Sequence, residues 1–282
     1  MDNVLVREYL DNKKNVFKKL GKENLLVVTD FDRTLTHAYK EDGEPVPSLI
    51  SVLRDEKHID GDYAQRAKEL FDTYFPIEND SSIPYEKRYE AMEEWWRKHT
   101  NLLIEKGLTR DIIRKAAQSS RIRLRTGVVE LFKWFESENI PVVIFSSNNL
   151  GRDSVKDCLE YHKILYSNVS VISNKFEYDN NGVVIGHRGN LLHTYNKNFS
   201  VVENNKRIRD KVLSRDLALV IGDSLGDRNM VDDSHFEEVI SFGFLNENSD
   251  EKAKEYSDIF DVVIKNDGEF TYIEEILREV FG

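Results

Sequence analysis

Short apolar segments alternate with helical patterns through much of this 282-residue chain, and that alternation limits its fold more than any other feature. Each apolar segment has the length and character of a strand whose two faces are both buried in a parallel sheet. The segments are NLLVVTD near the start, then IPVVIFSS, NVSVISN, LALVIGDS, EEVISFGF and FDVVIKN. Such an alternation predicts the α/β class, with a doubly wound parallel sheet whose functional site lies at the carboxyl ends of the strands.

Helical patterns fill most of the chain around these strands. The first twenty residues predict a helix, because their apolar residues fall roughly on one side. Further helices are expected at TGVVELFKWFESEN, LGRDSVKDCLEYH, DEKAKEYSD and TYIEEILREVF, and a hairpin at FEYDNNGVVIG, where Asn-Gly forms the turn.

A different pattern covers residues 42–125, which are rich in charge and mostly helical. One apolar stripe of a long helix is formed by Tyr89, Met92, Trp96, His99 and Leu103. We expect Gly107 to end this helix and Thr109 to cap the next one. The sequence therefore predicts a sheet-based part made from residues 1–41 and 126–282, with a mainly helical part, residues 42–125, inserted between them.

Acidic residues outnumber basic ones by 51 to 40, which gives a formal net charge of -11. A protein that binds nucleic acid or an anionic membrane needs a basic surface, so this charge argues against both partners. The single cysteine, Cys158, excludes an internal disulfide and fits a reducing compartment. No apolar leader or membrane span is visible, and we expect a cytoplasmic protein.

Two aspartates follow the first predicted strand, in the segment TDFDRTLT. If the backbone stays extended there, the side chains of Asp30 and Asp32 point the same way. Crowded carboxylates are unfavourable unless a cation or a proton lies between them, and a phosphoryl-transfer site supplies both. A polar turn that happens to contain two aspartates would be the better interpretation of Asp-x-Asp alone. The longer pattern Asp-x-Asp-x-Thr-Leu after an apolar strand favours catalysis.

A second acidic motif, LVIGDSLGDRNM, places Asp223 and Asp227 just after another predicted strand. Carboxylate oxygens at a strand end suit Mg²⁺, and Gly222 and Gly226 permit a tight backbone path. A surface Gly-Asp turn is the alternative, and the first motif upstream disfavours it. The sequence therefore predicts a magnesium site here.

Further groups could bind the phosphate itself. Ser146 ends the strand VVIFSS, where its hydroxyl and the following backbone N–H groups can hold a phosphate oxygen, although serine there is often a helix cap. A cation near the nucleophile would stabilise the transferring phosphoryl group. Lys175, Arg188 and Lys197 all fit that role by local chemistry. A lone cation is usually a solvated surface group, and spacing does not choose between the three.

These segments, in this order, resemble the motifs of the haloacid dehalogenase superfamily, and more closely those of the type III cytosolic 5'-nucleotidases, also called pyrimidine 5'-nucleotidases. The likeness runs from about Leu25 to the C-terminus and includes TDFDRTLT, PIEND ahead of EKRYEAMEEWW, PVVIFSS, VISNKFEYDNNGVVIGHRGNLLHTYNK and IGDSLGDRNM. It implies a Rossmann-like core with a helical cap. It also implies a monomeric, Mg²⁺-dependent hydrolase of nucleoside 5'-monophosphates that works through an aspartyl-phosphate.

The resemblance assigns catalytic and metal-binding roles to four aspartates. It makes Asp30 the nucleophile and Asp32 the acid/base group. Asp223 binds magnesium together with Asp30 and the backbone carbonyl of Asp32, and Asp227 supports the metal site.

The family's catalytic lysine falls on Lys197, so the resemblance selects it from the three cations. The substrate contacts that the resemblance implies fall on Glu78, Trp96, His99, Ser146, Ser147 and Lys197. Glu78 matches a cap glutamate that reads the nucleoside, and Trp96 matches an aromatic residue beside the base. Core packing on its helix is an equally good interpretation of Trp96. The chain departs from the family pattern at His99, where a serine is expected. It departs again at Ser146-Ser147-Asn148, where the family has Ser-Ala-Gly.

Other functions stay open beside this one. The base of the nucleotide is a pyrimidine or 7-methylguanine on these grounds. A phosphatase of another small phosphate monoester, or a phosphotransferase that passes the phosphoryl group to a hydroxyl, would use the same aspartates. A non-catalytic binding protein would have lost Asp30, Asp32 or Asp223, and all three are present.

Overall fold

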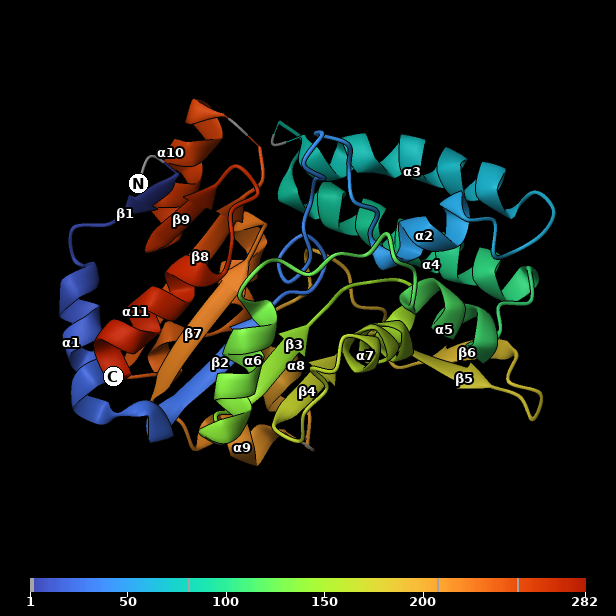
Figure 1. Cartoon of the computed structure of the whole chain (residues 1–282). Coiled ribbons are helices and arrows are strands. Elements are labelled where there is room, and N and C mark those ends of the chain that lie inside the picture. Colours follow the sequence, from blue (N-terminus) through green and yellow to red (C-terminus); the bar gives the residue numbers. More distant parts are fainter. Residues whose placement is uncertain (1–2, 81, 207, 248) are drawn as a thin grey trace.

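The computed structural model describes residues 3–80, 82–206, 208–247 and 249–282, and a seven-stranded sheet runs through the centre of this part of the chain (Figure 1). The strand order is β1-β9-β8-β7-β2-β3-β4. The strands are β1 (Val4–Val6), β2 (Leu25–Thr29), β3 (Val142–Phe145), β4 (Val169–Ile172), β7 (Leu217–Gly222), β8 (Glu238–Leu245) and β9 (Val262–Lys265). All neighbours from β9 to β4 pair in parallel, and this confirms the predicted sheet.

Strand β2 shows why the sheet is covered on both faces. Every residue of β2 is buried. Leu25 and Val27 belong to one hydrophobic cluster and Leu26 and Val28 to another, because successive side chains of a strand point to opposite faces. Two apolar layers therefore sandwich the sheet, as a doubly wound fold requires.

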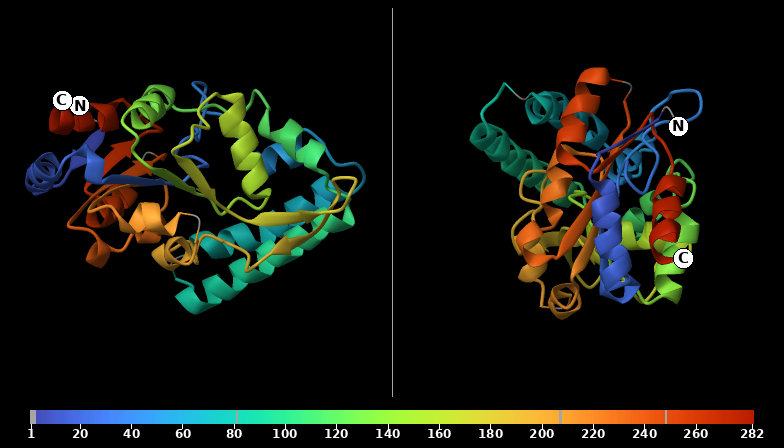
Figure 2. Two further views of the ribbon diagram at one scale, coloured as in Figure 1. Left: turned by 90° about the horizontal axis from the view of Figure 1, so that it is seen from below. Right: turned by 90° about the vertical axis from the view of Figure 1, so that its left-hand side faces the viewer.

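Helices complete these layers. One face is covered by α1 (Leu10–Leu20), α6 (Val128–Ser137), α7 (Gly151–Tyr161) and α11 (Thr271–Phe281). The other face is covered by α8 (Phe199–Glu203) and α9 (Arg209–Leu213), while α10 (Asp250–Ile259) packs with β8 and β9. Figure 2 shows α1 and α11, the blue and red helices, side by side, and their Phe17 and Phe281 rings lie 6.4 Å apart.

The helical segment predicted between β2 and β3 is present. It contains α2 (Leu49–Asp55), α3 (Tyr63–Asn79), α4 (Tyr85–Glu105) and α5 (Arg110–Ala117), which lie beyond one end of the sheet in Figure 1. Gly107 follows α4 with a positive φ of 68°, and the Thr109 side chain accepts the N–H of Ile112 at the start of α5. Both local predictions are therefore confirmed, while the limits 42 and 125 of a separate domain stay a prediction.

The predicted hairpin consists of β5 (Lys175–Tyr178) and β6 (Val184–Arg188). It forms a separate two-stranded sheet that packs on the helical segment and on α7, where the Tyr178 hydroxyl donates to Asp153 at 2.8 Å. The Val184 N–H donates to the Leu108 carbonyl at 2.8 Å, and the Arg110 N–H donates to the Gly182 carbonyl at 2.8 Å. The helical segment, which precedes β3 in the chain, and the hairpin, which follows it, thus form one layer.

The prediction of a helix over the first twenty residues is wrong at its start. Residues 1–2 lie outside the described part of the chain, Val4–Val6 form β1, and the helix begins only at Leu10. Strand β1 pairs antiparallel with β9, so its backbone hydrogen bonds come from residues more than 250 positions away. The helical periodicity of a short segment cannot anticipate such a partner.

Several short helices also lie outside the predicted elements. They are α8, α9, η1 (Lys22–Asn24), η2 (Leu225–Met230) and η3 (Asp233–His235). Within the described residues, every helix is too short or too polar to cross a membrane.

Candidate active site

Three neighbouring strands bring the predicted motifs to one edge of the sheet. Thr29, the last residue of β2, pairs with Ile144 of β3 on one side and with Ile221 of β7 on the other. Asp30, Ser146 and Asp223 therefore leave the sheet at the same level, although they lie far apart in sequence. The convergence predicted from the strand ends is confirmed.

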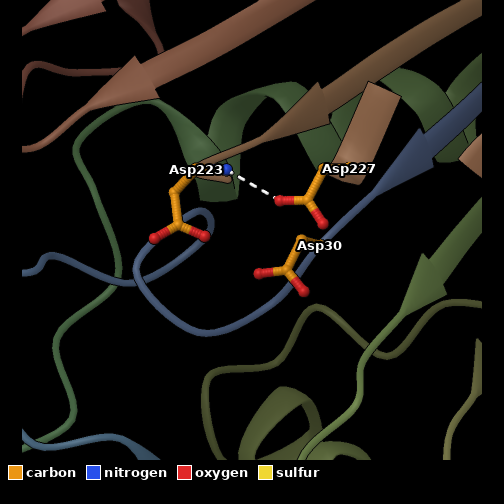
Figure 3. A group of neighbouring side chains, drawn as sticks. All are labelled: Asp30, Asp223 and Asp227. Atoms are coloured by element: carbon orange, nitrogen blue, oxygen red, sulfur yellow. Dashed lines mark hydrogen bonds between the residues drawn. The ribbon is translucent and has the colours of Figure 1, made fainter. Parts of the chain in front are cut away.

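An acidic group forms where these strands end. Asp30, Asp223 and Asp227 each offer a carboxylate oxygen, and the three oxygens lie within 4.8 Å of one another (Figure 3). A divalent cation prefers such hard oxygen ligands. The arrangement therefore fits Mg²⁺, with oxygen donors close enough to share one ion.

Asp227 is itself held by protein groups. One of its oxygens accepts the N–H groups of Asp223 and Ser224, both at 3.0 Å, and the other lies 2.6 Å from the Lys197 ammonium. A Cβ atom on Gly222 would lie 2.2 Å from the Asp227 Cβ, so only glycine allows this close approach. With both oxygens engaged, Asp227 is placed to support the metal ligands.

Lys197 lies at the centre of the acidic group. Its Nζ is 2.5 Å from Asp30 Oδ1, and only 5% of its side chain is exposed. The other two cations left open by the sequence, Lys175 and Arg188, face each other across the β5–β6 hairpin, and Arg188 pairs with Glu177. The structure therefore brings Lys197, of these three, to the first motif.

Burial shifts the protonation of the acidic group. It raises the pKa of Asp30 to about 7, against the lowering effect of Lys197 and with a further rise from Asp227. Burial, followed by the charges of Asp30 and Asp227, raises the pKa of Asp223 well above its ordinary value. For Lys197 burial alone would lower the pKa, but the two carboxylates outweigh it and raise the pKa. The carboxylates therefore favour a cation or a proton between them.

The Asp32 carboxyl group is held by two separate segments. Its Oδ1 accepts the N–H of Leu49, at the start of α2, at 3.2 Å. Its Oδ2 accepts a hydrogen bond from the side-chain amide of Asn148 at 2.7 Å. Burial raises the pKa of Asp32, although the Asn148 hydrogen bond acts in the opposite direction.

The loop after β3 carries Ser146 and Ser147. The Ser146 hydroxyl accepts the N–H of Asn148 at 3.2 Å, as in a tight turn. The carbonyl of Ser147 accepts the indole N–H of Trp96 at 2.8 Å. Helix α4 thus contacts the loop that contains Ser146 and Ser147, the predicted phosphate-binding residues.

Glu78 and Trp96 both reach the site from the helical segment. Glu78 accepts the hydroxyl of Thr194 at 2.6 Å, and its backbone carbonyl accepts the hydroxyl of Tyr195 at 2.6 Å. Burial raises the pKa of Glu78. Because Thr194 and Tyr195 precede Lys197 by two or three residues, Glu78 lies beside the segment that carries the lysine.

His99 lies deeper in the interior. Its Nδ1 is 3.2 Å from the Asn149 amide nitrogen and its Nε2 is 3.1 Å from the Tyr63 hydroxyl. Burial lowers the pKa of His99 to about 4, so the ring is neutral near pH 7. Both ring nitrogens have protein partners, and this geometry favours support of the loop after β3 over direct contact with a substrate.

The sequence did not indicate Arg125, which is buried beside the first motif. Its guanidinium donates to the carbonyls of Arg33 and Thr34 at 2.6 and 2.8 Å, and it lies 4.2 Å from the centre of the Phe244 ring. Arg125 therefore fixes the backbone just after Asp32. A charged residue in a polar segment gives no sequence signal of such burial.

Magnesium ions should stabilise the fold more at about pH 8 than at about pH 6. Between the ordinary pKa of 3.8 and about 7, the folded chain holds a proton on Asp30 that the unfolded chain has released. Without metal, stability therefore falls as the pH rises through this window. A bound cation replaces the proton, so its affinity rises with pH.

Thermal melting with and without MgCl₂ at the two pH values measures this effect. Asp223→Asn is the control and should reduce the gain at both. An equal gain at both pH values in the unchanged protein would contradict the prediction.

Comparisons with known proteins agree with this geometry. A family model described as pyrimidine 5'-nucleotidase (UMPH-1) matches residues 33–281. The chain is 32% identical over 282 residues to the 7-methylguanosine phosphate-specific 5'-nucleotidase A of Xenopus laevis, which covers 99% of this chain and 96% of that protein. It is 30% identical over 264 residues to the human 7-methylguanosine phosphate-specific 5'-nucleotidase, with coverage of 93% and 87%.

Solved structures extend the comparison to the fold. The crystal structure of cytosolic 5'-nucleotidase IIIB bound to cytidine matches with a TM-score of 0.90 at 28% identity, over 99% of this chain and 94% of that chain. A haloacid dehalogenase family hydrolase from Salmonella enterica, only 13% identical, has a TM-score of 0.55 over 91% of this chain and 72% of its own, and shares the fold.

Proposed function

Because the chain belongs to the pyrimidine 5'-nucleotidase (UMPH-1) family, within the haloacid dehalogenase superfamily, we propose that it hydrolyses nucleoside 5'-monophosphates to a nucleoside and phosphate at the site around Asp30. One observation carries this proposal. The Asp30 carboxylate lies at the carboxyl end of β2, 2.5 Å from a buried lysine and beside two further aspartates. This is an arrangement for a nucleophile that attacks a charged ester.

The reaction proceeds in two steps. Asp30 attacks phosphorus, the bond to the 5'-oxygen breaks, and Asp32 donates its proton to that oxygen as the nucleoside leaves. Asp32 then removes a proton from water, which attacks the phosphoryl group on Asp30 and releases phosphate. Acid/base assistance of this kind is typically worth roughly 10²–10⁴-fold in rate.

The surrounding residues balance charge and hold the phosphate. Asp30, Asp223 and the backbone carbonyl of Asp32 would hold Mg²⁺, with support from Asp227, and the ion when bound neutralises part of the negative charge of the phosphate. Lys197 stabilises the remaining charge from its position 2.5 Å from Asp30. Ser146 and Ser147, in the loop after β3, bind the phosphate oxygens.

The helical segment supplies the nucleoside contacts. Trp96 is half-buried and hydrogen-bonded to the Ser147 carbonyl, so its ring lies where a base could stack near the phosphate loop. An indole ring binds a cationic base such as 7-methylguanine well. The relatives are named for 7-methylguanosine phosphate, and the matched structure holds cytidine. We therefore include both 7-methylguanosine and cytidine monophosphates as substrates, with Glu78 as the polar contact to the nucleoside.

Phosphate release from a panel of substrates tests the function. With Mg²⁺, we expect turnover of 7-methylguanosine, cytidine and uridine monophosphates, and little turnover of simple sugar phosphates. A chelator in excess should stop the reaction. Activity on sugar phosphates alone would contradict the nucleotidase function, and phosphate transfer only in the presence of an added alcohol would indicate a phosphotransferase.

Replacing Trp96 by alanine should weaken nucleotide binding. Stacking of one base on an aromatic ring is worth about 1–3 kcal/mol, so KM should rise roughly 5- to 150-fold with a smaller change in kcat. Steady-state kinetics with the best nucleotide of the panel measures this. Trp95→Ala is the matched control, because this neighbouring indole stacks on Tyr74 and meets the Trp96 ring only edge-on. Equal effects of the two substitutions would assign Trp96 to core packing.

A further inference from the structure

The amide of Asn148 lies directly against the proposed acid/base group. Its Nδ2 is 2.7 Å from Asp32 Oδ2, although the two residues are 116 positions apart in the chain. Asn148 is 7% exposed, so water does not compete freely for this hydrogen bond. At this position the family resemblance leads one to expect a glycine, which has no side chain to make such a contact.

The orientation of the Asn148 amide is fixed by the backbone around it. The Leu150 N–H donates to Asn148 Oδ1 at 2.7 Å, and the Asn148 N–H donates to the Ser146 hydroxyl at 3.2 Å. If the amide were flipped, its NH₂ group would face the Leu150 N–H, and two donors would meet. Asn148 therefore presents a donor to Asp32 and cannot present an acceptor.

The second oxygen of Asp32 is fixed from another direction. Oδ1 accepts the N–H of Leu49, the first residue of α2, at 3.2 Å. Two donors, one on each oxygen, set both the position and the plane of the carboxyl group. One lone pair on each oxygen is thereby occupied. The proton that Asp32 transfers is therefore confined to the remaining lone pair of either oxygen.

We propose that Asn148 is a positioning residue that orients the Asp32 carboxyl group toward the leaving 5'-oxygen of the substrate. The inference rests on the proposed function and deepens it. As the phosphorus–oxygen bond breaks, its electron pair stays on the 5'-oxygen and the proton of Asp32 joins it there. Asp32 is left as a carboxylate, which the Asn148 N–H stabilises. Misplacing such a group by a fraction of an ångström slows proton transfer.

A role limited to holding the loop predicts a different result. Asn148 also contacts Leu150 and Ser146, so its loss could disturb the phosphate contacts for every substrate equally. The positioning role and the loop-holding role can be separated with two substrates whose leaving groups differ only in whether they must be protonated. The nucleoside 5'-monophosphate leaves as an alkoxide that must be protonated, whereas its analogue with sulfur in place of the bridging 5'-oxygen leaves as a thiolate without a proton.

The experiment compares kcat/KM for cytidine 5'-monophosphate and its 5'-bridging phosphorothiolate, because kcat/KM reports formation of the phosphoenzyme and excludes the common second step. Asn148→Asp keeps the acceptor for Leu150 and replaces the donor to Asp32 by an oxygen, and Asn148→Ala removes both. Asn149→Ala is the matched control. This neighbouring asparagine is 6% exposed and contacts Thr100 and Trp96 instead of Asp32. Asp32→Asn marks the full effect of losing the proton donor.

Both Asn148 variants should lower kcat/KM roughly 10- to 100-fold for the oxygen ester and less than about threefold for the sulfur analogue. Asn149→Ala should change both substrates by the same factor. Equal losses on both substrates with Asn148→Asp would overturn the inference and leave the nucleotidase function intact. If the unchanged protein cleaves neither substrate, nor any other nucleotide of the panel, the proposed function fails and the inference with it.

Discussion

Asp30→Asn should lower turnover of nucleoside monophosphates by roughly 10⁴–10⁶-fold, the range expected when a catalytic nucleophile is lost. An amide oxygen is a poor nucleophile toward a phosphate dianion, so the aspartyl-phosphate cannot form. Rapid acid quenching followed by mass spectrometry of the intact protein measures the phosphoenzyme directly. The unchanged protein should gain one phosphoryl group, and the variant none.

The same substitution should not destabilise the fold in the absence of metal. Asp30 is buried beside the carboxylates of Asp223 and Asp227, and neutralising it removes repulsion while the Lys197–Asp227 ion pair remains. We therefore expect a melting temperature equal to or above that of the unchanged protein, because catalytic sites often sacrifice stability for function. Near-native turnover, or a labelled Asp30→Asn protein, would overturn the assignment of Asp30.

Lys197→Met should reduce turnover about 10²–10³-fold, because it removes the cation that stabilises charge in the transition state. It should also lower the free energy of unfolding without metal by about 3–5 kcal/mol, the usual cost of breaking a buried ion pair. The Lys197 ammonium contacts Asp30 and Asp227 at 2.5 and 2.6 Å, and its loss leaves the Asp227 charge without its buried partner. Denaturant unfolding and steady-state kinetics measure the two effects.

Magnesium affinity separates this role from a structural one. The lysine competes with the metal for the Asp30 carboxylate, so Mg²⁺ should bind the Lys197→Met variant at least as tightly as the unchanged protein, as measured by titration calorimetry. Lys68→Met is the matched control. Its ion pair with Asp72 is exposed on α3, and its loss should change neither activity nor stability appreciably. Loss of both Mg²⁺ binding and activity in Lys197→Met would mean that the lysine builds the metal site instead.

The sheet and the acidic group could be predicted because each depends on a local pattern. Four buried apolar residues in a row make β2 a strand wherever it pairs, and parallel strands end at the same edge of a sheet. The meeting of Asp30 and Asp223 can therefore be predicted even when no individual contact between side chains is known. Lys197 was one of three candidates by chemistry, and only the family resemblance selected it before the structure placed it beside Asp30.

The contacts that hold these groups could not be predicted in the same way. Asn148 reaches Asp32 because the loop after β3 turns through hydrogen bonds to Ser146 and Leu150, and nothing in the segment SSNN specifies that turn. Arg125 is buried among carbonyl groups and the Asp267 carboxylate, which come from distant segments. The first strand depends wholly on β9 as its partner. In each case the deciding partner is remote in sequence, whereas periodicity reports only on neighbours.

The backbone hydrogen bonds between the β5–β6 hairpin and residues 108–110 have a consequence for any large displacement of the layer around α4. Leu108 and Arg110 are bonded to Val184 and Gly182, so a displacement that kept these bonds would carry the hairpin with the helices and away from α7, where the Tyr178 hydroxyl donates to Asp153. The chain would then have four pivot points, at the two ends of residues 42–125 and at the two ends of the hairpin. A simple insertion would have only two. Excising residues 42–125 would strip the hairpin of its backbone partners and expose an unpaired strand edge to other molecules.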